Sequence, residues 1–168
     1  MKLKEILLPT LALCVICVVF TGAMAVVHHV TKEPIEENLK LEATAARESM
    51  FPGAAFEERG DYFAAYQDRT LLGYIMETRA RGYGGEIEVM TAVSPRGGVM
   101  RVRVLSAGEE TPGLGQRITE EDFLGRFAGI DNPHEIDGIT GATISSNGLK
   151  DAVRQALAIF SRIGGDAS

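Results

Sequence analysis

A segment near the C-terminus, Asp137-Gly138-Ile139-Thr140-Gly141-Ala142-Thr143, presents a hydroxyl group where a phosphate can be bound or attached. Gly141 and Ala142 let a large group approach the backbone closely. Ser145 or Ser146 is predicted to cap the helix that follows, and the free N–H groups and dipole of a helix start favour an anion. The alternative is a loop whose Thr and Ser residues only cap that helix. This segment alone leaves the two interpretations equal.

A second segment, Glu110-Thr111-Pro112-Gly113-Leu114-Gly115, is predicted to form a tight loop because proline and glycine fix its turns. It offers backbone N–H groups, and Leu114 adds an apolar surface. Such a loop suits a flat heteroaromatic ring with polar edges, although an ordinary surface loop between a strand and a helix has the same composition. His134 is the only histidine beyond the pair at 28–29. The sequence shows no Ser-His-Asp arrangement, no nucleotide-hydrolase phosphate loop and no metal-ligand spacing, so we predict no catalytic residue and no metal ligand.

The N-terminal region carries a membrane signal, because Ile6–Val27 contains 22 residues without a charge. At about 1.5 Å per residue this run spans about 33 Å, against a hydrocarbon core of about 30 Å. We expect residues 1–5 to be cytoplasmic, residues 6–27 to cross the membrane as one helix, and the rest of the chain to follow on the outer side, since Lys2 and Lys4 favour the cytoplasm. The alternative is a signal peptide cleaved after Ala23-Met24-Ala25, but the apolar run exceeds the roughly 7–15 residues of that class.

Both cysteines, Cys14 and Cys17, lie inside this apolar run. Their Cys-x-x-Cys spacing is typical of redox or metal sites. Two thiols supply only half of a tetrahedral metal site, however, and cysteine also behaves as a small hydrophobic residue. We interpret the pair as part of the apolar helix.

The remaining sequence predicts an α+β domain in which helices flank an antiparallel sheet. Hairpins without repeated β-α-β units favour this class. Strands are predicted at residues 62–67, 71–80, 87–93 and 99–105, and helices at 33–50, 120–127 and 147–163. Phe51-Pro52-Gly53 is predicted to end the first of these helices. We expect a membrane-proximal helical segment at 28–60 and the domain itself at 61–168.

Alternating and helical periodicity predict which side chains face the core. On the last strand, Met100, Val102 and Val104 are expected to point inward, with arginines on the solvated face. The last helix carries one apolar stripe, formed by Leu149, Val153, Leu157, Phe160 and Ile163. After Glu5 the chain holds 15 of the 17 basic and 22 of the 23 acidic residues, a net charge of −7. This acidity argues against nucleic acid and anionic lipid headgroups as partners.

Taken together, the motifs resemble those of a known family. Gly82-Tyr83-Gly84-Gly85 before a strand, Glu110–Gly115 and Asp137–Thr143 occur in the order and spacing of the G subunit of Rnf-type ion-translocating electron transport complexes. The N-terminal anchor and Phe51-Pro52-Gly53-Ala54 match as well, so the resemblance covers nearly the whole chain. The C subunit of the sodium-pumping NADH:quinone reductase shares the flavin domain and the motifs at Glu110–Gly115 and Asp137–Thr143, but it is usually longer.

The resemblance implies that Thr143 carries covalent FMN through a phosphoester. A separate flavin transferase would attach it outside the cytoplasm, using FAD as donor and releasing AMP. The stretch that this transferase recognises would comprise Asp137, Thr140, Gly141 and Ala142. The loop Glu110–Gly115 would line the isoalloxazine ring. Tyr83 is a weaker candidate, because an aromatic residue at a strand end can equally pack on the core.

The function implied is that of a single-pass subunit of the inner membrane, with its flavin domain in the periplasm. It would relay electrons within a complex that couples electron flow between ferredoxin and NAD to Na⁺ or H⁺ movement. Alone, it would complete no reaction. One alternative is the C-type subunit or another extracytoplasmic flavin reductase. An alternative of a different class is a cofactor-free, membrane-tethered scaffold whose loops are only turns and caps.

Overall fold

The computed structural model describes residues 3–108 and 110–164, with the side chains of 3–9, 32–37 and 39 excepted. The predicted cytoplasmic segment 1–5 therefore has no described side chain. The chain divides into two compact units between Glu42 and Ala43.

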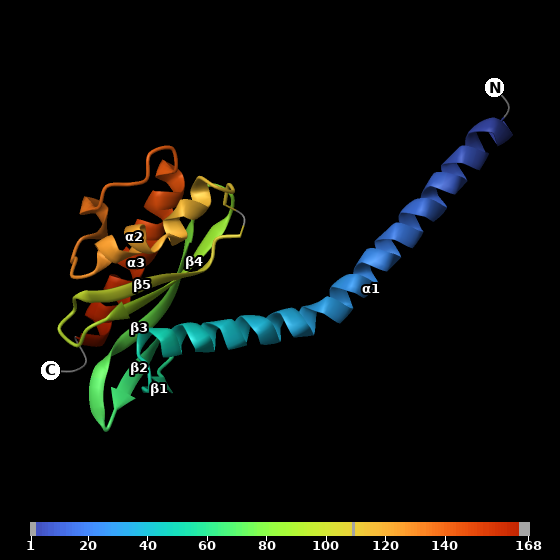
Figure 1. Cartoon of the computed structure of the whole chain (residues 1–168). Helices are drawn as coiled ribbons and strands as arrows, with labels where there is room; N and C mark the ends of the chain where they lie inside the picture. Colours follow the sequence, from blue (N-terminus) through green and yellow to red (C-terminus); the bar gives the residue numbers. More distant parts are fainter. Residues whose placement is uncertain (1–2, 109, 165–168) are drawn as a thin grey trace. The chain divides into compact units, whose positions relative to one another are not determined.

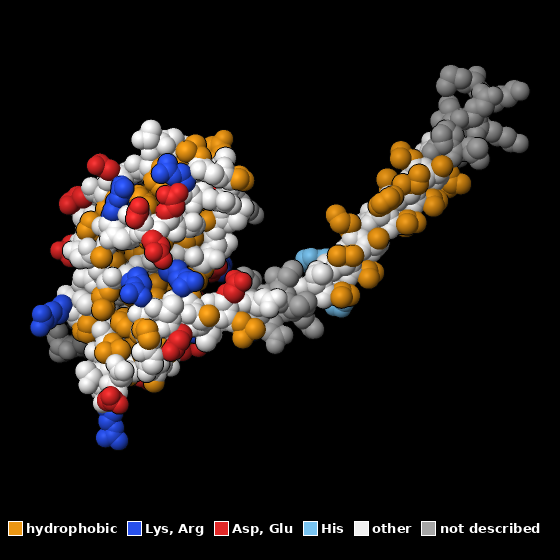
Figure 2. Space-filling model, viewed as in Figure 1, with side chains coloured by type: hydrophobic (Ala, Val, Ile, Leu, Met, Phe, Trp, Pro, Cys, Tyr) orange, Lys and Arg blue, Asp and Glu red, His pale blue; other side chains and the backbone are white. Residues whose placement is uncertain are grey.

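The first unit is helical. Helix α1, Leu3–Met50, is continuous, so the helix predicted over 33–50 has no separate start. Among the described residues, Thr10–Thr31 form the one stretch that is long and apolar enough to cross a membrane. Figure 2 shows hydrophobic side chains along it, and the stretch contains no Asp, Glu, Lys or Arg. Cys14 and Cys17 are free and exposed on this stretch, as expected for apolar positions of a spanning helix.

The predicted helix end at Phe51-Pro52-Gly53 is confirmed. Helix α1 ends at Met50, and Phe51 N donates to the Arg47 carbonyl oxygen over 3.1 Å. Gly53 has φ of 73°, a left-handed conformation that glycine adopts without steric cost. Its N–H donates to the Glu48 carboxylate over 2.8 Å, which completes the turn into the sheet.

The second unit is built on an antiparallel sheet of five strands, in the order β1-β2-β3-β4-β5 (Figure 1). The strands are β1 (Ala55–Glu58), β2 (Tyr62–Gln67), β3 (Thr70–Arg81), β4 (Glu86–Val93) and β5 (Val99–Ser106). The fold class and the four predicted strands are confirmed. Strand β1 was not predicted, because four residues with two glutamates give no alternating apolar pattern at an exposed sheet edge.

Both faces of the sheet are covered. Helix α3, Thr143–Gly164, packs on one face, where its Leu149 and Val153 belong to the same buried cluster as Ile87 and Val89 of β4. The last turns of α1 supply the other face through a cluster that comprises Ala46, Met50, Phe51, Ala65, Ile75, Met90 and Ala92. Strand β4 is therefore buried on both sides. The predicted stripe on the last helix is confirmed, with its C-terminal members Leu157, Phe160 and Ile163 half-buried.

The compact unit begins at Ala43, earlier than the boundary expected before Asp61. Ala46, Met50 and Phe51 are core residues of this unit, each at most 5% exposed. The C-terminal end of α1 is thus part of the sheet domain. The preceding turns belong to the first unit.

Met100 does not face the core as predicted, and a β-bulge is the reason. Ala92 pairs with Arg101 but Val93 pairs with Val99, so Met100 is the extra residue of β5. Alternation restarts across the bulge, which buries Val99 and leaves Met100 46% exposed. Val102 is buried and Val104 half-buried, as expected.

Short helices connect β5 to α3. They are η1 (Gly115–Thr119), α2 (Glu121–Leu124), η2 (Gly125–Phe127) and η3 (Pro133–Glu135). The helix predicted over 120–127 is therefore α2 followed by η2. Phe123 and Phe127 point into the core, with ring centroids 5.7 Å apart. Ala107, where the loop after β5 begins, belongs to the same buried cluster as Leu149 of α3.

Candidate functional site

Thr143 is the first residue of helix α3, not part of a loop before the helix. Ile139 to Ala142 form the preceding turn, in which Ala142 N donates to the Ile139 carbonyl oxygen over 2.9 Å. Gly141 has φ of 83°, as the third position of a type II turn requires. The helix begins as Ser146 N donates to the Ala142 carbonyl oxygen. The Thr143 side chain is exposed, and no hydrogen bond holds its hydroxyl within the described chain.

Ser145 and Ser146 do not cap the helix, because α3 starts before them and both side chains are buried. The Ser146 hydroxyl oxygen accepts from Ile139 N over 3.0 Å and holds the preceding turn against the helix. The Ser145 hydroxyl donates to the Glu110 carboxylate. The residue before the helix, Ala142, has no side-chain oxygen that can act as a cap. The interpretation that these serines serve only as caps is therefore wrong.

The two predicted segments meet at one pocket of about 460 Å³. Its walls come from the turn after β3, the loop before η1 and the start of α3. The lining residues are Tyr83, Thr111, Leu114, Gly115, Gly141, Ala142, Thr143, Ile144 and Ser145. No lining side chain carries a formal charge, and the N-terminus of a 22-residue helix lies at one wall. A helix start favours an anion, and an apolar wall suits a flat ring.

Tyr83 lies at this pocket and is 69% exposed, so it does not pack on the core. Leu114 and Ile144 are also exposed, by 40% and 55%. A large exposed apolar side chain on a folded domain commonly marks a binding surface when several gather together. Ile144 was not singled out from the sequence. Its position directly after Thr143 is the feature of the sequence that could have identified it.

Several predicted site residues do not line the pocket. Glu110 is buried beneath it, and Pro112 and Gly113 are exposed in the loop outside it. Asp137 and Thr140 are exposed on the turn that leads to Thr143. The structure therefore separates the predicted residues that line the pocket from those that are buried beneath it or exposed outside it.

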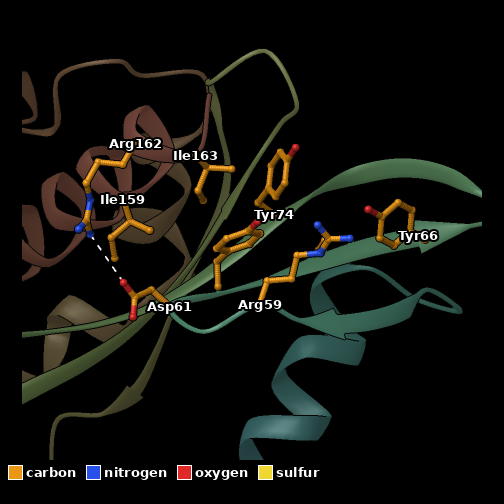
Figure 3. Close-up of a pocket in the computed structure, with 9 residues that line it drawn as sticks. Arg59, Asp61, Tyr66, Tyr74, Ile159, Arg162 and Ile163 are labelled. Atoms are coloured by element: carbon orange, nitrogen blue, oxygen red, sulfur yellow. Dashed lines mark ion pairs between the residues drawn. The ribbon is translucent and has the colours of Figure 1, made fainter. Parts of the chain in front are cut away.

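A second pocket, of about 340 Å³, lies at the far end of α3 (Figure 3). Ile159 is 16 residues after Thr143, which corresponds to about 24 Å along a helix. Arg162 Nη2 lies 3.9 Å from Asp61 Oδ2. A side-chain hydrogen bond to Glu57 raises the pKa of Arg59. Both cations thus have carboxylate partners. This pocket contains none of the predicted site residues.

Two family models match the chain. One, described as the FMN-binding domain, covers residues 82–158, from the turn after β3 through most of α3. The other, described as the RnfG N-terminal region, covers residues 1–48. All three segments that carry the predicted site fall inside the first match.

Curated relatives bear related descriptions. The G subunit of a proton-translocating ferredoxin:NAD(+) oxidoreductase complex from Clostridium ljungdahlii is 32% identical, over 58% of each chain. The G subunit of a Na(+)-translocating ferredoxin:NAD(+) oxidoreductase complex from Acetobacterium woodii is 26% identical, over 91% of this chain and 90% of the relative. The G subunit of an ion-translocating oxidoreductase complex from Escherichia coli is 27% identical, over 81% and 82%.

Among solved structures, the chain is similar to the C subunit of a Na(+)-translocating NADH-quinone reductase from Parabacteroides distasonis. The identity is 26% and the TM-score 0.46, over 54% of this chain and 55% of that one.

Proposed function

Because the chain belongs to the family of G subunits of Rnf-type ion-translocating oxidoreductase complexes, we propose that it is a membrane-anchored electron carrier with FMN bound covalently at Thr143. The observation that carries this proposal is the position of the Thr143 hydroxyl. It is exposed at the start of α3, free of hydrogen bonds to the described residues, and at the wall of a pocket that the second predicted loop completes.

The residues at the pocket fit FMN. The N-terminus of α3 stabilises the phosphate, and the small residues Gly141 and Ala142 lie at the same wall of the pocket. Leu114 and Ile144 offer apolar contact to the isoalloxazine ring, and Tyr83 offers an aromatic face. Bound FMN supplies the ability to accept and donate one or two electrons, and protein contacts tune its potential.

Attachment requires a second protein in this proposal. A flavin transferase brings FAD to the exposed segment before Thr143, where Asp137 and Thr140 are accessible for recognition. The Thr143 oxygen forms a bond to the flavin-side phosphorus of FAD, the phosphorus–oxygen bond to AMP breaks, and AMP leaves. The hydroxyl proton is released, and nothing is oxidised or reduced.

The membrane topology follows from the apolar helix. Thr10–Thr31 cross the inner membrane once. Lys2 and Lys4 support a cytoplasmic N-terminus, which in this proposal puts the flavin domain in the periplasm. A covalent link suits that location, since a cofactor attached by a phosphoester is not lost to the outside.

The partners are the other subunits of a membrane complex. Relatives described as belonging to ferredoxin:NAD(+) oxidoreductase complexes support electron flow between ferredoxin and NAD, coupled to Na⁺ or H⁺ movement. One apolar helix provides no polar path across the membrane. This protein therefore relays electrons while other members of the complex move the ion.

Two matched substitutions test the proposal. Thr143→Val keeps the shape of the side chain and removes the hydroxyl, whereas Thr143→Ser keeps the hydroxyl. After co-expression with a flavin transferase, flavin fluorescence on a denaturing gel should be present in the wild type, retained in Thr143→Ser and absent in Thr143→Val. Fluorescence that persists in Thr143→Val would contradict attachment at this residue. A colourless wild type, with the transferase active on a control substrate, would favour a cofactor-free tether.

A further inference from the structure

Glu110 is a buried carboxylate beneath the flavin pocket, only 2% exposed. Burial of a carboxylate is unfavourable unless hydrogen bonds compensate it. One oxygen, Oε2, accepts from the Ser145 hydroxyl on the first turn of α3. The other, Oε1, accepts from Gly84 N in the turn after β3, over 3.3 Å. A single side chain thus joins two segments that are far apart in the sequence.

Two glycines make space for this carboxylate. A β-carbon placed on Gly82 would overlap Glu110 Oε1, and one on Gly115 would lie 2.9 Å from Oε2. The atoms nearest to the Gly115 position all belong to Glu110 and Ser145. Gly82 and Gly115 therefore have a specific role, which is to leave space for the buried Glu110 side chain.

The residues that Glu110 holds are neighbours of the pocket walls. Tyr83 lies between Gly82 and Gly84, and Thr143 lies two residues before Ser145. We propose that Glu110 is a positioning residue for flavin attachment, which fixes the Thr143 hydroxyl and the Tyr83 ring at the spacing that accepts the flavin. This inference rests on the proposed function of Thr143 as the acceptor.

Loss of this link should slow attachment without abolishing it, because Glu110 contacts none of the reacting atoms. Misplacement of reacting groups by about 1 Å costs up to about 100-fold in rate. We therefore expect Glu110→Ala and Ser145→Ala to lower the kcat of transfer by about 10- to 100-fold. The KM for the protein substrate should change little, since Asp137 and Thr140 remain exposed for recognition.

The experiment measures transfer to the full-length chain in detergent, with purified flavin transferase and FAD. Initial rates are read as flavin on the denatured chain, at several concentrations of this protein. Glu110→Gln is the conservative variant, because its amide still spans Ser145 and Gly84, and it should recover most of the lost kcat. Thr78→Val is the matched control: it removes a buried hydrogen bond between β3 and α3, from Thr78 Oγ1 to the Ala152 carbonyl oxygen, without contact to Glu110.

A second measurement uses the chain without flavin. Hydrogen exchange should become at least about tenfold faster at Gly84 N–H in Glu110→Ala, because its acceptor is gone. The same amide should exchange at the wild-type rate in Thr78→Val. If Glu110→Ala fails to fold, Gly115→Ala and Ser145→Ala carry the test, since each perturbs the link while Glu110 remains in place. Transfer to both at the wild-type kcat would then overturn the inference.

The outcomes separate this inference from the proposed function. A wild-type chain that gains no flavin overturns the function, and this inference with it. A wild-type chain that is loaded at Thr143, with Glu110→Ala and Ser145→Ala loaded at the same kcat, overturns only the positioning role. A fall in kcat that is equally large in Thr78→Val would also overturn it, because a general loss of stability would then explain the result.

Discussion

Leu114 lies against Gly141, and this contact joins the two predicted motifs into one site. A β-carbon placed on Gly141 would lie 3.2 Å from Leu114 Cδ2. Gly141 also has φ of 83°, a conformation that L-residues with side chains rarely adopt. The turn thus favours glycine here, and an added β-carbon would also make Leu114 shift by a few tenths of an ångström.

Substitution of Gly141 by alanine should therefore affect both stability and flavin attachment. We expect Gly141→Ala to cost about 1 kcal/mol of unfolding free energy from backbone strain, and to shift the Leu114 side chain at the pocket wall. Gly129→Ala is a matched control, because Gly129 has φ of 77° but no atom within 4 Å of an added β-carbon. Denaturant unfolding and flavin loading, measured on both variants, check this. Equal loading of the two variants at equal stability would contradict the role of the contact.

Two buried threonines on the α3 side of the sheet should respond to the same substitution with opposite signs. Thr78 Oγ1 donates to the Ala152 carbonyl oxygen over 2.9 Å. Thr91 Oγ1 is buried without a hydrogen-bond partner in the described part of the chain. We expect Thr78→Val to destabilise by about 1 kcal/mol, and Thr91→Val to stabilise by a similar amount because it removes an unsatisfied polar group. Thermal unfolding of both variants measures the difference, and a lower Tm for Thr91→Val would be inconsistent with it.

The bulge in β5 predicts different stability effects for substitutions at Met100 and Val102. Met100 is exposed and Val102 is buried, although alternation before the bulge assigns them the same face. Met100→Gln should change the unfolding free energy by less than about 0.5 kcal/mol, as for an ordinary surface position. Val102→Ala should cost about 2 kcal/mol, because it removes buried apolar area. Similar costs for the two substitutions would show that the strand register differs from the one described.

Truncation should show where the flavin domain begins. A chain of residues 43–168 retains Ala46, Met50 and Phe51, whereas a chain of 61–168 loses them together with β1. Burial of a methionine or phenylalanine side chain is worth about 1.5–3 kcal/mol. The shorter chain should therefore lose several kcal/mol, out of a total of about 5–15 kcal/mol for a typical domain. A cooperative thermal transition is expected for 43–168 alone, and an equally cooperative one for 61–168 would contradict the assignment.

The sequence was sufficient where local chemistry decides the structure. Strand β2 has the predicted bounds, and Phe51-Pro52-Gly53 ends a helix as proline and glycine dictate. The segments at Glu110–Gly115 and at Asp137–Thr143 were identified from residue type and spacing, and the structure brings both to one pocket. Periodicity also identified the buried stripe of α3, because a long amphipathic helix has a strong pattern.

The sequence was insufficient where tertiary contacts decide. Ser145 and Ser146 are typical cap residues, but the turn before Thr143 starts the helix four residues earlier than predicted and buries both hydroxyls. Met100 follows an alternating pattern that one extra residue interrupts. Glu110 is a charged residue in a polar loop, and its burial depends on two glycines in other segments. No local pattern encodes such a contact.

The most direct test of the central claim is the intact mass of the denatured wild-type chain after co-expression with a flavin transferase, followed by peptide mapping. We predict a gain of one FMN less one water, located on the peptide that contains Thr143. An unmodified mass, with the transferase shown to be active on a control substrate, would contradict the account, as would FMN attached to any other residue.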